Sequence, residues 1–200
     1  MSNKKAKIYF SYAWNDHKTE VEKSREDLVN KLYNSLKSDN FDVYRDKENC
    51  SYGESISNFI DEIGQGDLIV VFMSEKYAKS PYCMRELFLI AQNNAFNKDN
   101  FSSAILPVLV ELIKFDDPEV LDTYFDYWNE ENEKWQKFMV KHRQNANREQ
   151  SKRAHIVQDI QQKFGTLSDW ITDINATNND LLQENDFEIV KQKIIERLGK

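Results

Sequence analysis

The chain has 200 residues, of which 27 are Lys or Arg and 34 are Asp or Glu, so its formal charge is −7. Five Gly and three Pro are too few for a collagen-like or low-complexity chain, and 12% aromatic residues are too many for a disordered one. No apolar run approaches the roughly 20 residues that a membrane helix needs. Composition and charge therefore predict a globular protein whose partners are neither membranes nor nucleic acids.

The two cysteines, Cys50 and Cys83, lack the spacing of a CxxC motif, and the three histidines are isolated in the sequence. The N-terminal stretch Met1–Lys5 leads into a strand-like segment and not into an apolar signal region. We therefore expect a cytoplasmic protein with reduced thiols and no metal site.

Strand-like and helical segments alternate through the first part of the chain. Residues 7–12 are rich in strand formers, and apolar residues then recur at helical spacing from Val21 to Ser38. A short strand over Phe41–Tyr44 is followed by a polar loop over Asp46–Gly53 and a helix over 55–64.

The next segments predict the centre of a sheet. Asp67–Met73 is a continuous apolar run, which is typical of a strand covered on both faces. Ser80–Pro81 opens a helix that continues to about Ala95, and 104–110 is a fourth strand. The order βαβαβαβ predicts an α/β fold with a flavodoxin-like parallel sheet and helices on both faces, whose ligands bind at the carboxyl ends of the strands.

Beyond residue 110 the pattern becomes helical. Asp117–Glu119 is a helix start, and a weakening apolar stripe follows it to Gly165. A fifth strand is either short and degenerate near Leu167–Ile171 or missing, and Asn185 or Asp186 caps a last helix. We therefore divide the chain into a core over 1–110 and a helical completion of the same domain over 111–200.

The nucleotide-binding motifs of such sheets are absent. No GxGxxG follows the first strand and no GxxxxGK[ST] occurs, so a Rossmann site and a P-loop are excluded. Candidate residues instead stand at the predicted carboxyl ends of the first two strands: Ser11, Tyr12, Trp14, Arg45 and Asp46. Glu86 lies near the start of the third helix, where the simplest interpretation is a favourable first-turn acid.

Four segments match a known family. They are 7–14, 45–56, 67–74 and 77–87, and their order and spacing resemble a TIR (Toll/interleukin-1 receptor) domain, more closely the bacterial type. The resemblance covers residues 7 to 110. It implies the fold described above and, as in many bacterial TIR domains, cleavage of NAD⁺ at the nicotinamide–ribose bond, with NAD⁺ as substrate and no cofactor.

The resemblance also implies a set of site residues. The family's catalytic glutamate falls on Glu86, within a pattern formed by Ser80, Tyr82 and Cys83, although Tyr82 stands where the family usually has Trp. Cys83 is expected to be a small buried residue and not a nucleophile. The residues expected to bind substrate are Ser11, Tyr12, Trp14, Arg45, Asp46, Tyr82 and Cys83.

The same resemblance leaves the product and the biological role open. Attack by water gives ADP-ribose, whereas attack by the substrate's own adenine or ribose hydroxyl gives a cyclic ADP-ribose isomer. The chain is similar to the signal-generating TIR proteins of bacterial anti-phage defence, which act on a separate nucleotide-sensing effector. The alternative is a non-catalytic scaffold that acts by homotypic TIR–TIR contacts, for which the loop Asp46–Gly53 resembles the family's BB loop. A host-directed virulence mimic would need an export signal, and none is visible.

Overall fold

A computed structural model describes residues 6–14, 20–45, 66–111, 113–174, 177–178 and 187–199. The predicted loop over Asp46–Gly53, the predicted helix over 55–64 and the predicted cap at Asn185 or Asp186 lie outside the described residues. Within the described part, no helix combines the length and the apolar character needed to cross a membrane.

Five parallel strands form one sheet in the order β2-β1-β3-β4-β5. Their bounds are β1 Lys7–Tyr12, β2 Asp42–Arg45, β3 Leu68–Met73, β4 Ile105–Leu109 and β5 Thr177–Asn178. Every residue of β3 is buried, which explains its continuous apolar sequence. Strand order 2-1-3-4-5 is the flavodoxin-like arrangement, so the predicted fold class is confirmed.

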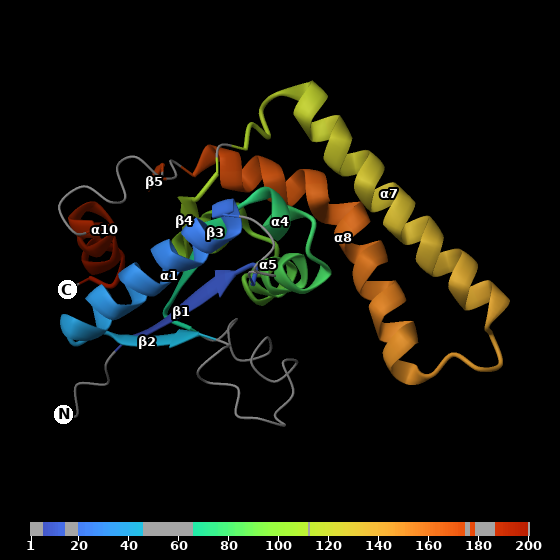
Figure 1. Cartoon of the computed structure of the whole chain (residues 1–200), viewed down its shortest axis with the longest axis horizontal. Coiled ribbons are helices and arrows are strands. Elements are labelled where there is room, and N and C mark those ends of the chain that lie inside the picture. Colours follow the sequence, from blue (N-terminus) through green and yellow to red (C-terminus); the bar gives the residue numbers. More distant parts are fainter. Residues whose placement is uncertain are drawn as a thin grey trace.

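Helices cover both faces of the sheet, as Figure 1 shows. Their bounds are α1 Glu20–Ser38, α4 Glu75–Ala78, α5 Pro81–Asn93, α6 Lys98–Ala104, α7 Pro118–Lys141, α8 Arg148–Asp173 and α10 Glu188–Arg197. One face packs against α1 and α10, in a cluster that includes Phe10, Leu32 and Ile194. The opposite face packs against α4, α5, α6, α7 and α8, in a cluster that includes Tyr9 and Trp128. We call these the α1 face and the α5 face.

The fifth strand lies elsewhere than predicted. Residues Leu167–Ile171, proposed as a degenerate strand, belong to α8, and β5 comprises only Thr177 and Asn178. Phe164, Leu167 and Ile171 are all buried and follow a helical spacing, so their apolar pattern belongs to a helix. Gly165 does not end the helix. A Cβ at this position would lie 3.2 Å from the ring of Phe125, and the glycine permits this close approach.

The apolar stripe after Asp117 is divided between two helices. α7 ends at Lys141, and α8 begins after a turn that contains neither Gly nor Pro. The sequence therefore carries no signal that separates the two helices. Asn147 caps α8: its Oδ1 accepts from Gln150 N at 3.0 Å, and Gln150 Oε1 accepts from Asn147 N at 2.7 Å. The two helices form a long hairpin that extends beyond the sheet (Figure 1).

Candidate functional site

Three buried polar side chains meet at the carboxyl end of β1 on the α5 face. Ser11 Oγ donates a hydrogen bond to Glu86 Oε2, and Tyr77 Oη lies 2.7 Å from Ser11 Oγ. The exposed fractions of Ser11, Tyr77 and Glu86 are 1%, 0% and 6%. Because the single hydroxyl hydrogen of Ser11 goes to Glu86, the Tyr77 hydroxyl is the donor to Ser11. The result is a directed chain from Tyr77 through Ser11 to the Glu86 carboxylate, which we call the Tyr77–Ser11–Glu86 chain.

Local sequence explains how α5 presents Glu86. Ser80 caps the helix by accepting from Cys83 N, and Pro81 occupies its first turn. Cys83 and Glu86 are three residues apart, so both point to the buried side of α5. The first turn of α5 contains no acidic residue, because Glu86 lies in the second turn. The interpretation of Glu86 as a favourable first-turn acid is therefore wrong, and its burial needs another explanation.

The electrostatic setting keeps Tyr77 protonated. Burial, followed by the negative charge of Glu86, raises the pKa of Tyr77 well above its ordinary value, and the hydrogen bond to Ser11 only partly offsets this. The phenol therefore remains a hydrogen-bond donor at neutral pH. Tyr77 is not among the predicted site residues, and its one signal in the sequence is its place in the matching segment 77–87.

Helix α7 holds the turn from which α5 begins. Trp128 Nε1 donates to the carbonyl of Ala78 at 3.2 Å, and the Tyr127 hydroxyl donates to the carbonyl of Lys79 at 2.9 Å. Trp128 is fully buried. Since Ala78 and Lys79 join Tyr77 to Ser80, these two bonds fix the turn between α4 and α5. Residues beyond 110 thus help to position the side chains predicted within the core.

Two predicted substrate-binding residues lie on the other face of the sheet. Tyr12 belongs to the α1-face cluster, with its ring 6.4 Å from that of Phe72. The guanidinium of Arg45 lies 4.1 Å from the centre of the Tyr33 ring, and its Nη1 donates to Asn30 Oδ1 at 2.5 Å. The structure does not bring these two side chains to Glu86, and their binding of substrate stays a prediction.

The remaining predicted residues fall into three groups. Cys83 is buried in the α5-face cluster, as expected for a small packed residue. Trp14 follows β1 and is 41% exposed, and Tyr82 is 49% exposed on the outer side of α5. Asp46 lies outside the described residues. Substrate binding by all of them stays a prediction.

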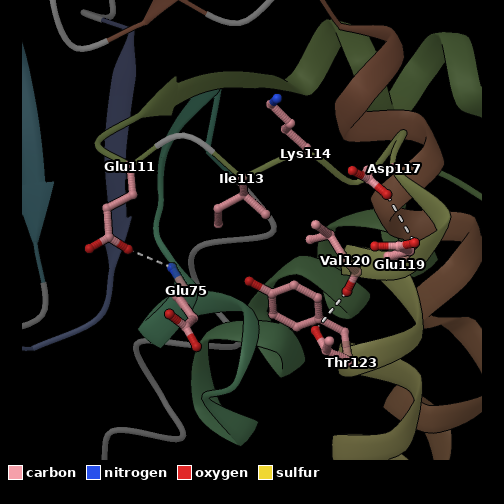
Figure 2. A pocket seen from close by; sticks show the side chains of 9 residues that line it. Glu75, Glu111, Ile113, Lys114, Asp117, Glu119, Val120 and Thr123 are labelled. Atoms are coloured by element: carbon pink, nitrogen blue, oxygen red, sulfur yellow. Dashed lines mark hydrogen bonds between the residues drawn. The ribbon is translucent and has the colours of Figure 1, made fainter.

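A hollow of about 520 Å³ lies past the carboxyl ends of β3 and β4, and Figure 2 shows its lining. Glu111 Oε2 accepts from the backbone N–H of Glu75 at 2.8 Å, and its Oε1 pairs with Arg25 at 2.9 Å. Burial, followed by the charges of Glu75 and Glu111, raises the pKa of Tyr124 to about 12. Asp117 and Glu119 also line the hollow, and Lys114 is the one basic residue among its described lining residues. The resulting negative potential disfavours a phosphate-bearing ligand.

Comparison with known proteins gives three results. The chain is similar to the disease resistance protein RPP2B of Arabidopsis thaliana, with 31% identity over 93 residues, which is 46% of this chain and 7% of that protein. Its structure resembles the TIR domains in the structure of the activated Roq1 resistosome directly recognizing the pathogen effector XopQ, with a TM-score of 0.55 and 19% identity over 96% of this chain and 98% of that one. At this identity the structural likeness shows the fold alone. The third result is a match of the TIR domain family model to residues 8–140, and the chain therefore belongs to the TIR domain family.

Proposed function

We propose that this TIR domain is an enzyme that cleaves NAD⁺ at the nicotinamide–ribose bond, with Glu86 as the catalytic residue. The observation that carries the proposal is the Tyr77–Ser11–Glu86 chain at the carboxyl end of β1. A buried carboxylate is costly to maintain, and hydroxyl donors that fix its orientation are typical of a reactive site. The position of Glu86 in the family's pattern with Ser80 and Cys83 supports the same assignment.

One carboxylate suffices for this chemistry. Nicotinamide leaves as a neutral molecule from a cationic ring, so no general acid has to protonate it, unlike the leaving group of an ordinary glycoside. The C1′–N bond breaks with its electron pair going to nicotinamide, and positive charge develops on the ribose. The Glu86 carboxylate stabilises that charge more in the transition state than in the substrate. The attacking group then bonds to C1′ and loses one proton to solvent. Attack by water gives ADP-ribose, whereas attack by the substrate's own adenine or ribose hydroxyl gives a cyclic isomer.

The test is NAD⁺ consumption by the purified protein at high concentration, with the products separated by chromatography. Glu86→Gln keeps the size of the side chain and removes its charge, and we expect the rate to fall by a factor of about 100 or more. Glu75→Gln is the matched control, because Glu75 is an acid on α4 that pairs with Lys79 at 2.6 Å and lies outside the chain of hydrogen bonds. Equal rates for wild type and Glu86→Gln would refute the proposal.

Self-association is the second part of the proposal. A structural relative is described as the TIR domains of a resistosome, which supports TIR–TIR contacts as a way of assembling this chain. Cleavage is therefore measured over a range of protein concentrations, with sedimentation velocity on the same samples. Assembled protein that leaves NAD⁺ intact would make the chain a non-catalytic scaffold. Similarity to a disease resistance protein supports immune signalling by the nucleotide product, and a bacterial anti-phage setting with a separate effector is the form of it that we propose.

A further inference from the structure

A small pocket lies between the start of α5 and the α7–α8 hairpin. Its volume is about 130 Å³. Three helices contribute to its wall, through Tyr82, Arg85, Trp135, Arg153, Ile156 and Val157. We call it the α5–α8 pocket.

Helical geometry separates the α5–α8 pocket from Glu86. Tyr82 and Arg85 are three residues apart and share one side of α5, whereas Cys83 and Glu86 share the side that packs on the sheet. Tyr82 is 49% exposed, while Glu86 is 6% exposed. The pocket is therefore a separate site on the same helix, and what binds there does not need to contact Glu86.

The charges of the pocket favour an anion. Two arginines line it, and no carboxylate of the described residues does. Neither Arg85 nor Arg153 forms an ion pair with another residue in the part of the chain that the structure describes. The hydrogen bond from Lys152 at 2.9 Å is the main cause that lowers the pKa of Glu149, and Arg153 contributes less. In a chain of charge −7, two neighbouring guanidinium groups without a bonded acid favour a phosphate, which they bind in a bidentate manner.

The remaining surface of the pocket favours a planar group. Tyr82 offers a half-exposed ring, Trp135 is partly buried, and the side chains of Ile156 and Val157 complete an apolar wall. Aromatic rings stack with nucleobases of any sequence, and each stacked base contributes on the order of 1–3 kcal/mol to binding. The volume of 130 Å³ is smaller than the roughly 300–1,000 Å³ of sites that enclose a drug-sized ligand, so the pocket accepts one planar group and not a whole dinucleotide.

We propose that the α5–α8 pocket binds a nucleoside monophosphate, with the base against Tyr82 and Trp135 and the phosphate on Arg85 and Arg153. This site is independent of the cleavage reaction proposed for Glu86. It stands on the aromatic walls and on the two arginines that the pocket brings together from α5 and α8.

The test is calorimetric titration of the full chain with AMP. Arg85→Gln and Arg153→Gln are each expected to weaken AMP binding about tenfold, which equals about 1.4 kcal/mol. Arg148→Gln is the matched control, because this exposed arginine begins α8 outside the pocket, and it is expected to leave the affinity unchanged. Glu86→Gln is also expected to bind AMP as the wild type does. Circular dichroism spectra verify that each variant is folded.

Adenosine and inorganic phosphate separate the two parts of the proposed ligand, and both are expected to bind more weakly than AMP. Phosphate binding as tightly as AMP would overturn the role of the base, and adenosine binding as tightly would overturn the role of the arginines. If Glu86→Gln loses AMP binding while both arginine variants retain it, the nucleotide binds at Glu86. That result would refute the α5–α8 pocket and leave the proposed cleavage standing. An absence of AMP binding up to millimolar concentration would also refute the pocket, whatever the cleavage assay gives.

Discussion

Each face of the sheet buries a cluster of apolar side chains, but the two faces differ in their buried polar groups. On the α1 face, Phe10 and Phe72 pack at 5.0 Å between ring centres, and the buried Lys191 pairs with Asp39 at 2.7 Å. The apolar cluster of the α5 face lies beside the Tyr77–Ser11–Glu86 chain. Buried polar groups cost stability even when they are bonded. On the α1 face the buried cation is neutralised by one ion pair, whereas the α5 face holds three connected polar groups, and this is the face on which we propose chemistry.

The largest effect is expected from Trp128→Ala compared with Phe10→Ala on the other face. Both residues are almost fully buried, and each truncation is expected to lower the free energy of unfolding by about 3–5 kcal/mol. Denaturant titration measures this loss. We further expect that NAD⁺ cleavage per folded molecule falls only in Trp128→Ala, because Trp128 holds the carbonyl of Ala78 at the start of the turn that leads to α5.

A milder variant at position 128 distinguishes loss of the hydrogen bond from loss of folding. Trp128→Phe keeps a large ring and removes the indole N–H, so a folded protein with slower cleavage is the expected outcome. Equal cleavage per folded molecule in the Trp128 and Phe10 variants would mean that the two faces do not differ in the way described above.

The next effect concerns the hydroxyl groups of the Tyr77–Ser11–Glu86 chain. Ser11→Ala removes the donor to the Glu86 carboxylate and is expected to slow NAD⁺ cleavage at least about tenfold, since one hydrogen bond to a charged group contributes roughly 1.5–3 kcal/mol. Tyr77→Phe removes a donor to the neutral Ser11 hydroxyl, a bond that contributes roughly 0.5–1.5 kcal/mol, so a smaller loss is expected. Because the two act through the same carboxylate, the double variant is expected to be no slower than Ser11→Ala alone. Tyr33→Phe on the α1 face is the control and is expected to cleave normally. Additive losses would contradict a connected chain.

Alkaline unfolding tests two buried tyrosines of the α5 face, Tyr77 and Tyr124. An unfolded tyrosine ionises near pH 10, whereas the pKa of Tyr77 is raised well above this value and that of Tyr124 is raised to about 12. Above pH 10 the unfolded chain therefore binds fewer protons than the folded chain, and stability falls as the pH rises through the window from 10 to 12. Denaturant titration at pH 7 and pH 11 measures this loss, which is expected to be smaller in Tyr77→Phe and Tyr124→Phe. An unchanged loss in both variants would exclude these residues as its source.

The smallest effect is expected from Gly165→Ala, in the outer layer of the α5 face. Alanine is favoured over glycine in a helix interior by about 1 kcal/mol, but the new Cβ would approach the Phe125 ring to 3.2 Å. Phe125 is 36% exposed and its ring can move outwards, so a net stabilisation below about 1 kcal/mol and normal cleavage are expected. Thermal unfolding measures the change, and a clear destabilisation would show that Phe125 is held firmly in place.

Local signals explain which elements the sequence predicts well. β3 is recognisable as an apolar run, and α5 begins at the predicted Ser80–Pro81 cap. Both signals depend only on residues that are adjacent in the sequence. β5 has two residues, too few for any pattern, and its pairing with Val108 and Leu109 depends on the rest of the fold. The turn between α7 and α8 was hidden because a capping box formed by Asn147 and Gln150 replaces the usual Gly or Pro.

Site residues were predictable where the fold itself dictates their position. Ser11 and Glu86 follow from a strand end and a family pattern, and the structure joins them. Tyr12 was grouped with Ser11 because the two are adjacent in the sequence. Adjacent residues of a strand point to opposite faces of the sheet, so this rule alone places Tyr12 and Ser11 on different faces. Tyr77 could not be found this way, since it meets Ser11 across 66 residues of sequence.

The bonds from α7 to the α4–α5 turn have a consequence for how this domain tolerates variation. Tyr127 and Trp128 bind the carbonyl groups of residues 79 and 78, and every amino acid supplies the same carbonyl. The side chain at position 79 can therefore change without loss of these bonds, whereas the two donors on α7 cannot be exchanged for groups lacking an N–H or O–H at that reach. Substitutions in the turn are therefore tolerated better than substitutions of the two aromatic donors. A library of functional variants covering both segments should contain many different residues at position 79 and few at position 128.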